Sequence, residues 1–310
     1  MTERDDDMTR IQGELQSLFD TRSLGEPKHL LGIEINRNYK DRTISLRQTS
    51  YIDAMLKRFG LENCNPVLTP MDPHVVIKNR TSPPANISLY QQLLGSLLYA
   101  AMCTRPDIAY AIHALSQYSV DPGEEHWTAA KRVLRYLKGT RDLALTYGGP
   151  EDWDDVLESY SDADWASNDD RKSISGFTFL LGGGAVSWSA KKQPIIALSS
   201  TESEYIAATH SSRHLIWLRS LLAELGHDQP SPSLLYMDNQ SAMALAQDDQ
   251  FHPRTKHIDI RYHFIRYLIK SGAIALVYCP TQDMIADIMT KGLARPLNDK
   301  HRTGLGVIAA

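Results

Sequence analysis

The chain has 310 residues, enough for two or three domains with substantial cores, and 42% of the residues are hydrophobic. Its 33 lysines and arginines are nearly balanced by 37 aspartates and glutamates, so the basic excess of many nucleic-acid-binding proteins is absent. No apolar run approaches the about 20 residues of a membrane span. Three widely spaced cysteines form no zinc-binding group, which favours a soluble intracellular protein, cytoplasmic or nuclear.

The first half of the chain predicts a short hairpin followed by helices. Two strands are expected over residues 30–35 and 43–46, joined by a polar turn. Ser50 is the candidate N-cap of a helix that ends at Gly60. The other helices of this half are expected over residues 8–19, 88–103, 106–119 and 124–138.

A change of pattern at residues 148–152, Gly-Gly-Pro-Glu-Asp, predicts a domain boundary near residue 150. Beyond it, three strands precede an alternation of helices and strands, an order that implies a mixed sheet flanked by helices. The strands are expected over residues 156–161, 176–181, 185–189, 234–237 and 273–279, and the helices over 201–225, 240–247, 255–271 and 283–290.

Four acidic residues occupy places where these elements should converge. Asp162 ends the first strand of the second half, Glu204 lies in the first turns of the long helix, Asp238 follows a later strand, and Asp287 belongs to the last predicted helix. Carboxylates gathered at one end of a sheet can hold divalent cations, and two such ions about 4 Å apart are a means of cutting phosphodiesters. The pattern therefore predicts a nuclease.

Nearby acids compete for some of these positions. Glu204 shares the sheet-facing side of its helix, whereas Glu202 lies about 200° away around the helix axis, so Glu204 is the preferred ligand. Asp162 and Asp164 share one face of a strand, and either could reach the site. Purely structural alternatives are that both glutamates are solvated and that Asp238 is the N-cap of the next helix.

Motifs throughout the second half resemble, in family order, the ribonuclease H domain of copia-type long-terminal-repeat retrotransposon polyproteins. The first half resembles the same polyproteins after the polymerase active site, at residues 24–35 and 90–110. The ribonuclease H motifs lie at residues 160–166, 171–177, 199–208, 237–242, 254–264 and 286–291.

The resemblance implies an α/β fold with a ribonuclease H-like mixed five-stranded sheet flanked by helices. A smaller α+β and helical reverse-transcriptase remnant would precede it. The expected segments are a C-terminal remnant of the reverse transcriptase over residues 1–80, a helical connection over 81–150 and a ribonuclease H-like domain over 151–310.

The resemblance also implies a catalytic chemistry. Asp162, Glu204, Asp238 and Asp287 match the acidic tetrad of the family, which would hold two Mg²⁺ or Mn²⁺ ions. The implied activity is hydrolysis of the RNA strand in RNA–DNA hybrids. Positive residues near the helix over 255–271 are candidates for nucleic-acid binding, although a solvated surface is an equal alternative. They are Arg254, Lys256, His257 and Arg261.

Two departures from the family pattern limit the expected activity. The polymerase signature Tyr-x-Asp-Asp is absent, so this chain alone is not expected to synthesise DNA, and the missing polymerase portion becomes a candidate partner. The loop over residues 279–283 lacks the histidine that many cellular ribonucleases H carry before the last acid. A non-catalytic nucleic-acid-binding remnant is therefore the alternative. An integrase-like transferase fits less well, because its last acid is normally glutamate.

Overall fold

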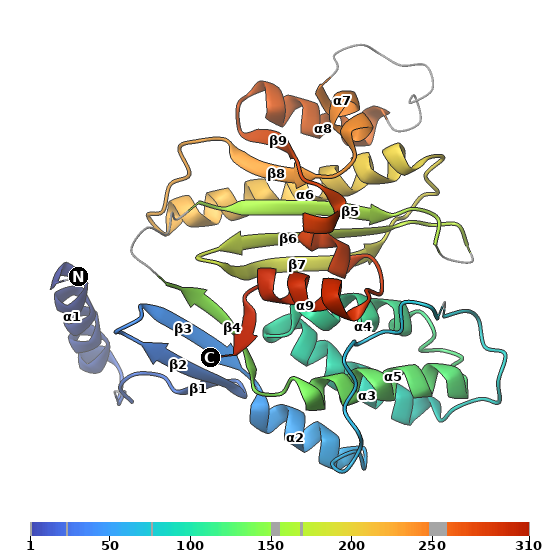
Figure 1. Ribbon diagram of the computed structural model, residues 1–310. Coiled ribbons are helices and arrows are strands. Elements are labelled where there is room, and N and C mark those ends of the chain that lie inside the picture. The colour runs from blue at the N-terminus through green and yellow to red at the C-terminus, as the bar shows by residue number, and fades with distance from the viewer. Residues whose placement is uncertain are drawn as a thin grey trace.

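A computed structural model of the chain describes residues 2–22, 24–75, 77–149, 156–167, 170–247 and 259–309 (Figure 1). It contains two five-stranded sheets, with strand orders β1-β2-β3-β4-β10 and β7-β6-β5-β8-β9. The first sheet lies beside a group of helices, and the second lies between helices on its two faces.

The first sheet is antiparallel and combines strands from the beginning, the middle and the end of the chain. The predicted hairpin is present, with Asn38 opposite Thr43. The sequence does not predict β4 or β10, which are short and take their strand identity from long-range pairing: β4 pairs with β3 on one side and with β10 on the other. The strands are β1 His29–Leu30, β2 Ile33–Asn38, β3 Thr43–Arg47, β4 Leu143–Gly148 and β10 Val307–Ala309.

The helices of the first half form one apolar core. Its buried residues include Tyr90, Leu97 and Leu134. Predicted helices are found in each expected region, although residues 106–119 divide into a 3₁₀ turn and a shorter helix. The elements are α2 Thr49–Arg58, α3 Ile87–Cys103, η1 Pro106–Ile108, α4 Ala109–Ser116 and α5 Glu124–Gly139.

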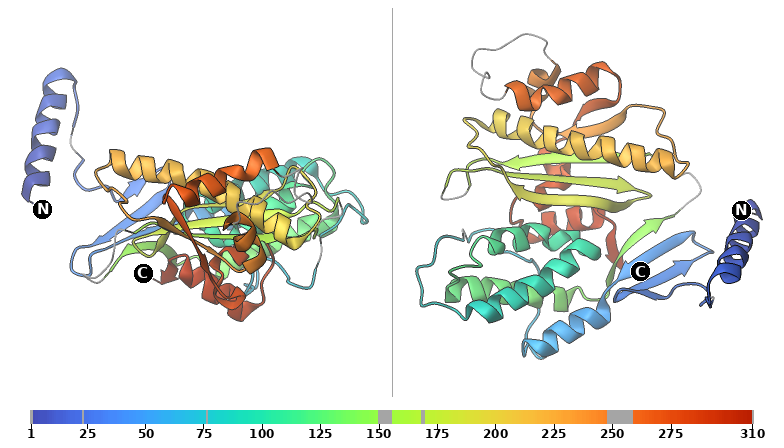
Figure 2. Two further views of the ribbon diagram at one scale, coloured as in Figure 1. Left: turned by 90° about the horizontal axis from the view of Figure 1, so that it is seen from above. Right: turned by 180° about the vertical axis from the view of Figure 1, so that it is seen from behind.

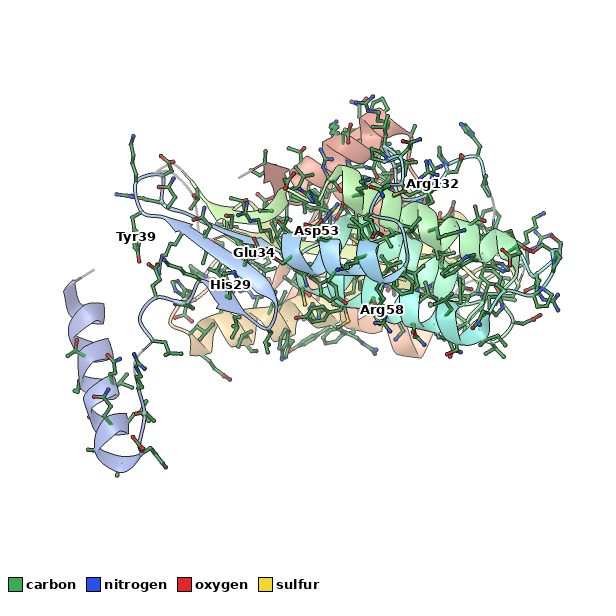
Figure 3. The ribbon with its side chains drawn as sticks, turned by 90° about the horizontal axis from the view of Figure 1, so that it is seen from below. His29, Glu34, Tyr39, Asp53, Arg58 and Arg132 are labelled. Carbon is green, nitrogen blue, oxygen red and sulfur yellow. The ribbon has the colours of Figure 1, made fainter. Side chains whose placement is uncertain are left out.

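The prediction that Ser50 caps α2 is wrong. Gln48 occupies the N-cap position, and Ser50 instead donates its backbone N–H to the Glu34 carboxylate on β2, at 3.0 Å. Glu34 also pairs with Arg47 of β3 at 2.9 Å, so one carboxylate ties the hairpin to the helix. Figure 3 labels Glu34 on the hairpin and Asp53 on α2.

Helix α1, Thr2–Leu18, stands apart from the rest of the chain in all views (Figures 1 and 2). It covers most of the predicted helix over residues 8–19. Its apolar side chains Ile11, Leu15 and Leu18 are exposed.

The second sheet confirms the predicted mixed arrangement. Strands β5, β6 and β7 pair antiparallel, whereas β8 is parallel to β5 and β9 is parallel to β8. This is the ribonuclease H-like five-stranded sheet that the family resemblance implied. The strands are β5 Glu158–Asp164, β6 Ile174–Leu181, β7 Gly184–Lys192, β8 Ser233–Met237 and β9 Ile274–Tyr278.

Helices cover both faces of this sheet. The long helix α6 lies on one face, where its Leu215 and Leu222 share an apolar core with Phe179 and Leu235 of the strands. The η4 and α9 segments lie on the other face (Figures 1 and 2). Residues 283–290 form 3₁₀ turns rather than the expected α-helix, and α9 is not predicted. The elements are α6 Ser200–Glu224, α7 Gln240–Gln247, α8 Asp259–Lys270, η3 Thr281–Asp283, η4 Ile285–Met289 and α9 Arg295–Gly304.

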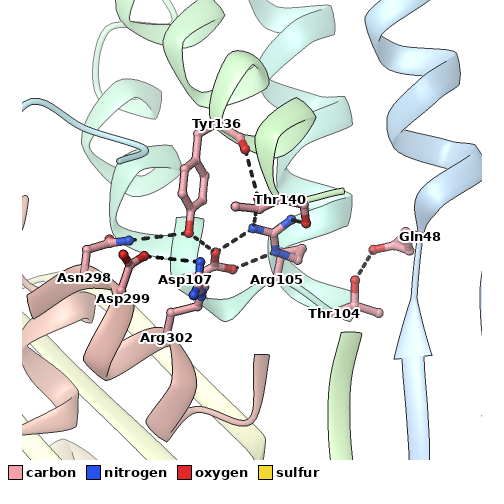
Figure 4. A network of polar contacts seen from close by, with 9 residues as sticks. All are labelled: Gln48, Thr104, Arg105, Asp107, Tyr136, Thr140, Asn298, Asp299 and Arg302. Atoms are coloured by element: carbon pink, nitrogen blue, oxygen red, sulfur yellow. Dashed lines mark hydrogen bonds and ion pairs between the residues drawn. The ribbon is translucent and has the colours of Figure 1, made fainter. Parts of the chain in front are cut away.

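A buried polar network connects α9 to the helices of the first half (Figure 4). Arg105 donates to both carboxylate oxygens of Asp107, at 2.9 and 2.7 Å, and both side chains are almost fully buried. Tyr136 donates to the same carboxylate at 2.7 Å and accepts from Asn298 of α9 at 3.5 Å. The last segments of the chain therefore contact its first half through this network and through the β4–β10 pair.

All three cysteines have free thiols. No helix in the described ranges combines the length and the apolarity that crossing a bilayer requires.

Candidate metal centre

The first acid of the site lies near the end of β5. Asp162 is 2% exposed, and it accepts a hydrogen bond from the Thr290 hydroxyl of the segment after η4. Its partner across the β5–β6 ladder is Gly176. A Cβ atom at Gly176 would lie 2.6 Å from Thr290 Cγ2 and 2.7 Å from Met289 Cβ. The absence of a side chain at Gly176 therefore lets the η4 segment approach the strand that carries Asp162.

The start of α6 places the second acid. Ser199 is the N-cap residue, and its hydroxyl accepts from the Glu202 N–H at 3.2 Å. Glu202 in turn accepts from the Leu198 N–H at 2.8 Å, an arrangement close to a capping box. Both Glu202 and Glu204 are buried, so the alternative of two solvated glutamates is wrong.

Glu204 has the features expected of a metal ligand. One of its carboxylate oxygens accepts from the Ala163 N–H of β5 at 3.2 Å. The other, Oε2, is buried and has no hydrogen-bond partner among the described residues. A buried carboxylate oxygen without a partner is energetically costly unless a cation or a proton compensates it.

The third acid follows β8. Asp238 accepts from the Thr281 hydroxyl of η3 at 2.8 Å. The alternative that Asp238 caps the next helix is wrong, because Asn239 performs that function: its side-chain oxygen accepts from the Ala242 N–H at 3.0 Å. The Asp238 carboxylate is thus not used by the helix start.

Three of the four predicted acids converge into one candidate ligand set. Asp162, Glu204 and Asp238 each offer a carboxylate oxygen, and these oxygens lie within 4.8 Å of one another. Asp164, the competing residue on β5, is not in this set. Three hard oxygen ligands close together suit a divalent cation, and the unpartnered Glu204 oxygen fits the same conclusion.

The fourth acid lies beside this set and is paired with a lysine. Asp287, in η4, is 1% exposed, and its carboxylate lies 2.9 Å from the ammonium group of Lys291. The same ammonium group lies 3.8 Å from the Asp162 carboxylate. Lys291 thus connects Asp287 to the three-acid set and supplies one positive charge to the cluster.

Burial and the nearby negative charges change the pKa values of these acids. Burial, followed by the negative charges of Asp162 and Asp238, raises the pKa of Glu204 well above its ordinary value. Burial and the charge of Asp162 raise the pKa of Asp287 to about 7. Burial also raises the pKa of Asp238, although the Thr281 hydrogen bond opposes this change. Divalent cations would reverse these shifts, because they favour the ionised forms.

The sequence analysis missed three residues of the site: Thr281, Thr290 and Lys291. Each contacts an acid that is distant in the chain, and Thr290 and Asp162 are 128 residues apart. One local signal was present, since Lys291 follows Asp287 by four residues, a spacing that favours ion pairs on helical segments.

The predicted nucleic-acid contacts cannot be placed. Arg254, Lys256 and His257 lie outside the described residues, and for Arg261 the backbone of α8 is described but the side chain is not.

Comparison with known proteins identifies curated relatives. No protein-family model matches the chain. It is 40% identical over 296 residues to the Retrovirus-related Pol polyprotein from transposon TNT 1-94 of Nicotiana tabacum, covering 93% of this chain and 22% of that protein. It is also 40% identical over 299 residues to the Retrovirus-related Pol polyprotein from transposon RE2 of Arabidopsis thaliana, covering 95% of this chain and 20% of that protein.

Similarity to solved structures is weaker. A ribonuclease H1 isolated from compost matches with a TM-score of 0.33 and 16% identity, covering 44% of this chain and 94% of that enzyme. A structure of the same enzyme in complex with an RNA/DNA hybrid matches with a TM-score of 0.32 and 16% identity, covering 43% of this chain and 93% of that one.

The strand order of the second sheet and the helices on its two faces define a ribonuclease H-like α/β protein. The chain belongs to the copia-type retrotransposon Pol polyproteins. It spans about a fifth of the length of the curated relatives named above.

Proposed function

We propose that this chain is the ribonuclease H portion of a retrotransposon Pol polyprotein and hydrolyses the RNA strand of RNA–DNA hybrids. In this proposal Asp162, Glu204, Asp238 and Asp287 hold two Mg²⁺ or Mn²⁺ ions. The observation that carries it is the buried, unpartnered Glu204 oxygen beside the carboxylates of Asp162 and Asp238. Residues 1–80 and 81–150 would be the reverse-transcriptase remnant and the connection region, and the missing polymerase portion would be a partner.

The residues of the chain have separate tasks in this mechanism. When bound, the metal ions would supply an activated water and stabilise the departing oxygen of the phosphodiester. Thr290 and Thr281 orient the carboxylates of Asp162 and Asp238 through their hydroxyl groups. Burial of Asp162, Glu204 and Asp287 excludes bulk water from their carboxylates and strengthens the attraction of these acids for cations. Recognition of a 2′-hydroxyl would restrict cleavage to RNA, and an intracellular location, cytoplasmic or nuclear, is part of the proposal.

The test is cleavage of a hybrid whose RNA strand is labelled at one end. Wild type with Mg²⁺ should cut the RNA strand, and EDTA should abolish cutting. Glu204→Gln and Asp238→Asn should each reduce cutting by at least about a hundredfold, because each removes a metal ligand. Glu202→Gln is the matched control: it changes a buried glutamate two residues away that accepts the Leu198 N–H and does not belong to the candidate ligand set. Equal cutting by wild type and Glu204→Gln would contradict the site.

One observation favours the alternative of a non-catalytic nucleic-acid-binding remnant. Lys291 already pairs with Asp287 and approaches Asp162, so part of the acidic cluster is neutralised without a metal ion. Hybrid binding by the wild type in EDTA, with no cutting after Mg²⁺ or Mn²⁺ is added, would support this alternative.

A further inference from the structure

A groove beside the metal centre has a composition that suits nucleic acid. Its volume is ≈ 460 Å³, and it lies between α6 and strands β6 and β7. Ser175 of β6 lines its strand side. Ser175 is paired with Ala163 of β5, the residue that donates its N–H to Glu204. The groove therefore begins on β6, the strand next to the Ala163 backbone of β5 that contacts Glu204.

Positive charge gathers in this groove. Lys191 from the end of β7 and His210 and Arg213 from α6 line it, and Lys191 and Arg213 are exposed. Their proximity is reflected in His210, whose pKa is lowered by burial and then by the charges of Arg213 and Lys191. No carboxylate lines the groove within the described part of the chain. Such a local excess of cations, in a chain of formal net charge −4, favours an anionic ligand.

An aromatic platform lies along the same groove. Trp217 of α6 is 55% exposed, although large aromatic side chains are usually well buried. Its ring centroid lies 5.2 Å from that of His214. His214 is in turn fixed by a 2.7 Å hydrogen bond with Ser187 and by stacking on Phe177. The exposed indole thus rests on a supported surface, as a base-stacking residue requires.

We propose that this groove binds one strand of the nucleic-acid substrate where it extends beyond the metal centre. Lys191 and Arg213 contact phosphates of the strand, and Trp217 stacks on one of its bases. The assignment rests on the proposed function for the identity of the substrate. It names residues other than the predicted Arg254, Lys256, His257 and Arg261.

The test measures binding, not cutting. Fluorescence anisotropy of labelled RNA–DNA hybrids of increasing length, in EDTA, gives the dissociation constant and its salt dependence. Arg213→Ala should weaken binding of the longer hybrids and reduce the slope of log affinity against log salt by about one. Trp217→Ala should weaken binding about 5- to 100-fold with little change in that slope, and Trp217→Phe should restore part of the loss.

Lys57→Ala is the matched control for the loss of one positive charge. Lys57 is exposed on α2, away from α6 (Figure 1), and the variant should bind like wild type. Wild-type binding by both Arg213→Ala and Trp217→Ala would overturn the groove assignment even if the protein cuts hybrids. Weakened binding by these variants in a protein that never cuts would instead refute only the proposed function.

Discussion

Lys291 shows how a single side chain balances the acidic cluster. Its ammonium group lies 2.9 Å from the Asp287 carboxylate and 3.8 Å from that of Asp162. Burial lowers the pKa of this lysine, but the charges of the two carboxylates raise it by a larger amount. The net pKa is therefore raised, and the lysine stays charged. A divalent cation bound to the same acids would be repelled by this charge.

Replacing Lys291 with methionine is therefore expected to have two opposite effects. Metal affinity should rise by about tenfold or more, because unit charges about 4 Å apart interact by about 4 kcal/mol at an effective dielectric constant near 20, partly screened by solvent. The Tm without metal should fall, since two buried carboxylates lose their counter-ion. Calorimetric Mn²⁺ titration and thermal unfolding measure the two effects. Unchanged metal affinity would contradict the expected repulsion between Lys291 and the metal ion.

The raised pKa of Asp287, about 7, predicts a pH dependence. Between about pH 4 and 7 the unfolded chain releases this proton while the folded protein retains it. Stability of the metal-free protein should therefore fall as the pH rises through this window, and stabilisation by Mg²⁺ should increase over the same range. Thermal unfolding with and without Mg²⁺ across this range measures both trends. Asp287→Asn should make both trends less steep, while the raised pKa values of Glu204 and Asp238 leave part of the pH dependence. Identical profiles for the two proteins would refute the assignment.

At the scale of elements, the approach of η4 to β6 depends on Gly176. A Cβ atom there would lie 2.6 Å from Thr290 Cγ2, 2.7 Å from Met289 Cβ and 3.2 Å from the Ala286 carbonyl oxygen. Contacts below 3 Å with packed atoms require the η4 segment to move. That segment carries Asp287 and also Thr290, which donates to Asp162.

Gly176→Ala is expected to reduce the free energy of unfolding by about 1–3 kcal/mol, as overpacked cores do, and to weaken metal binding. Gly95→Ala is the control, since a Cβ atom at this exposed position of α3 meets nothing within 4 Å. It should be neutral or stabilising by up to about 1 kcal/mol. Urea unfolding and metal titration of both variants provide the comparison. Wild-type stability and metal affinity in Gly176→Ala would contradict this expectation, because they would show that the η4 segment can move to accommodate the added methyl group.

The sequence predicted elements well where their signals are local. The boundaries of α3 and α5 follow from apolar periodicity and lie within one residue of the prediction. The strands β4 and β10 were missed because their pairing is decided by partners far away in the chain. The last predicted helix proved to be 3₁₀ turns, and its η4 segment packs closely on β6.

At the scale of the whole molecule, the buried network around Asp107 joins α9 to the helices of the first half (Figure 4). Arg105 pairs with Asp107 at 2.7 Å, with side-chain exposures of 1% and 0%. Removing one partner of a buried pair leaves an uncompensated charge. The division into segments 1–80, 81–150 and 151–310 stays a proposal, and this network lies between the last two.

Asp107→Asn should therefore lower the free energy of unfolding by about 3–5 kcal/mol, the usual consequence of breaking a buried ion pair from one side. Asp53→Asn is the matched control, because Asp53 forms a surface pair with Arg141 whose side chains are 46% and 43% exposed. That change should alter stability by no more than about 1 kcal/mol. Chemical denaturation measures the free energy of unfolding of the two variants. Equal decreases would show that the buried ion pair stabilises the protein no more than the surface pair does.

The sequence by itself determined the family, through the resemblance of its motifs. It also determined the mixed sheet and the candidate acids Asp162, Glu204 and Asp238, because the order of elements along the chain and the helix periodicity are local signals. Only the tertiary structure decided that Asn239 rather than Asp238 caps α7, and that Lys291 lies between Asp287 and Asp162. The same holds for the joining of β10 to β4. Such pairings join residues far apart in the chain, and they form only when packing brings those segments together.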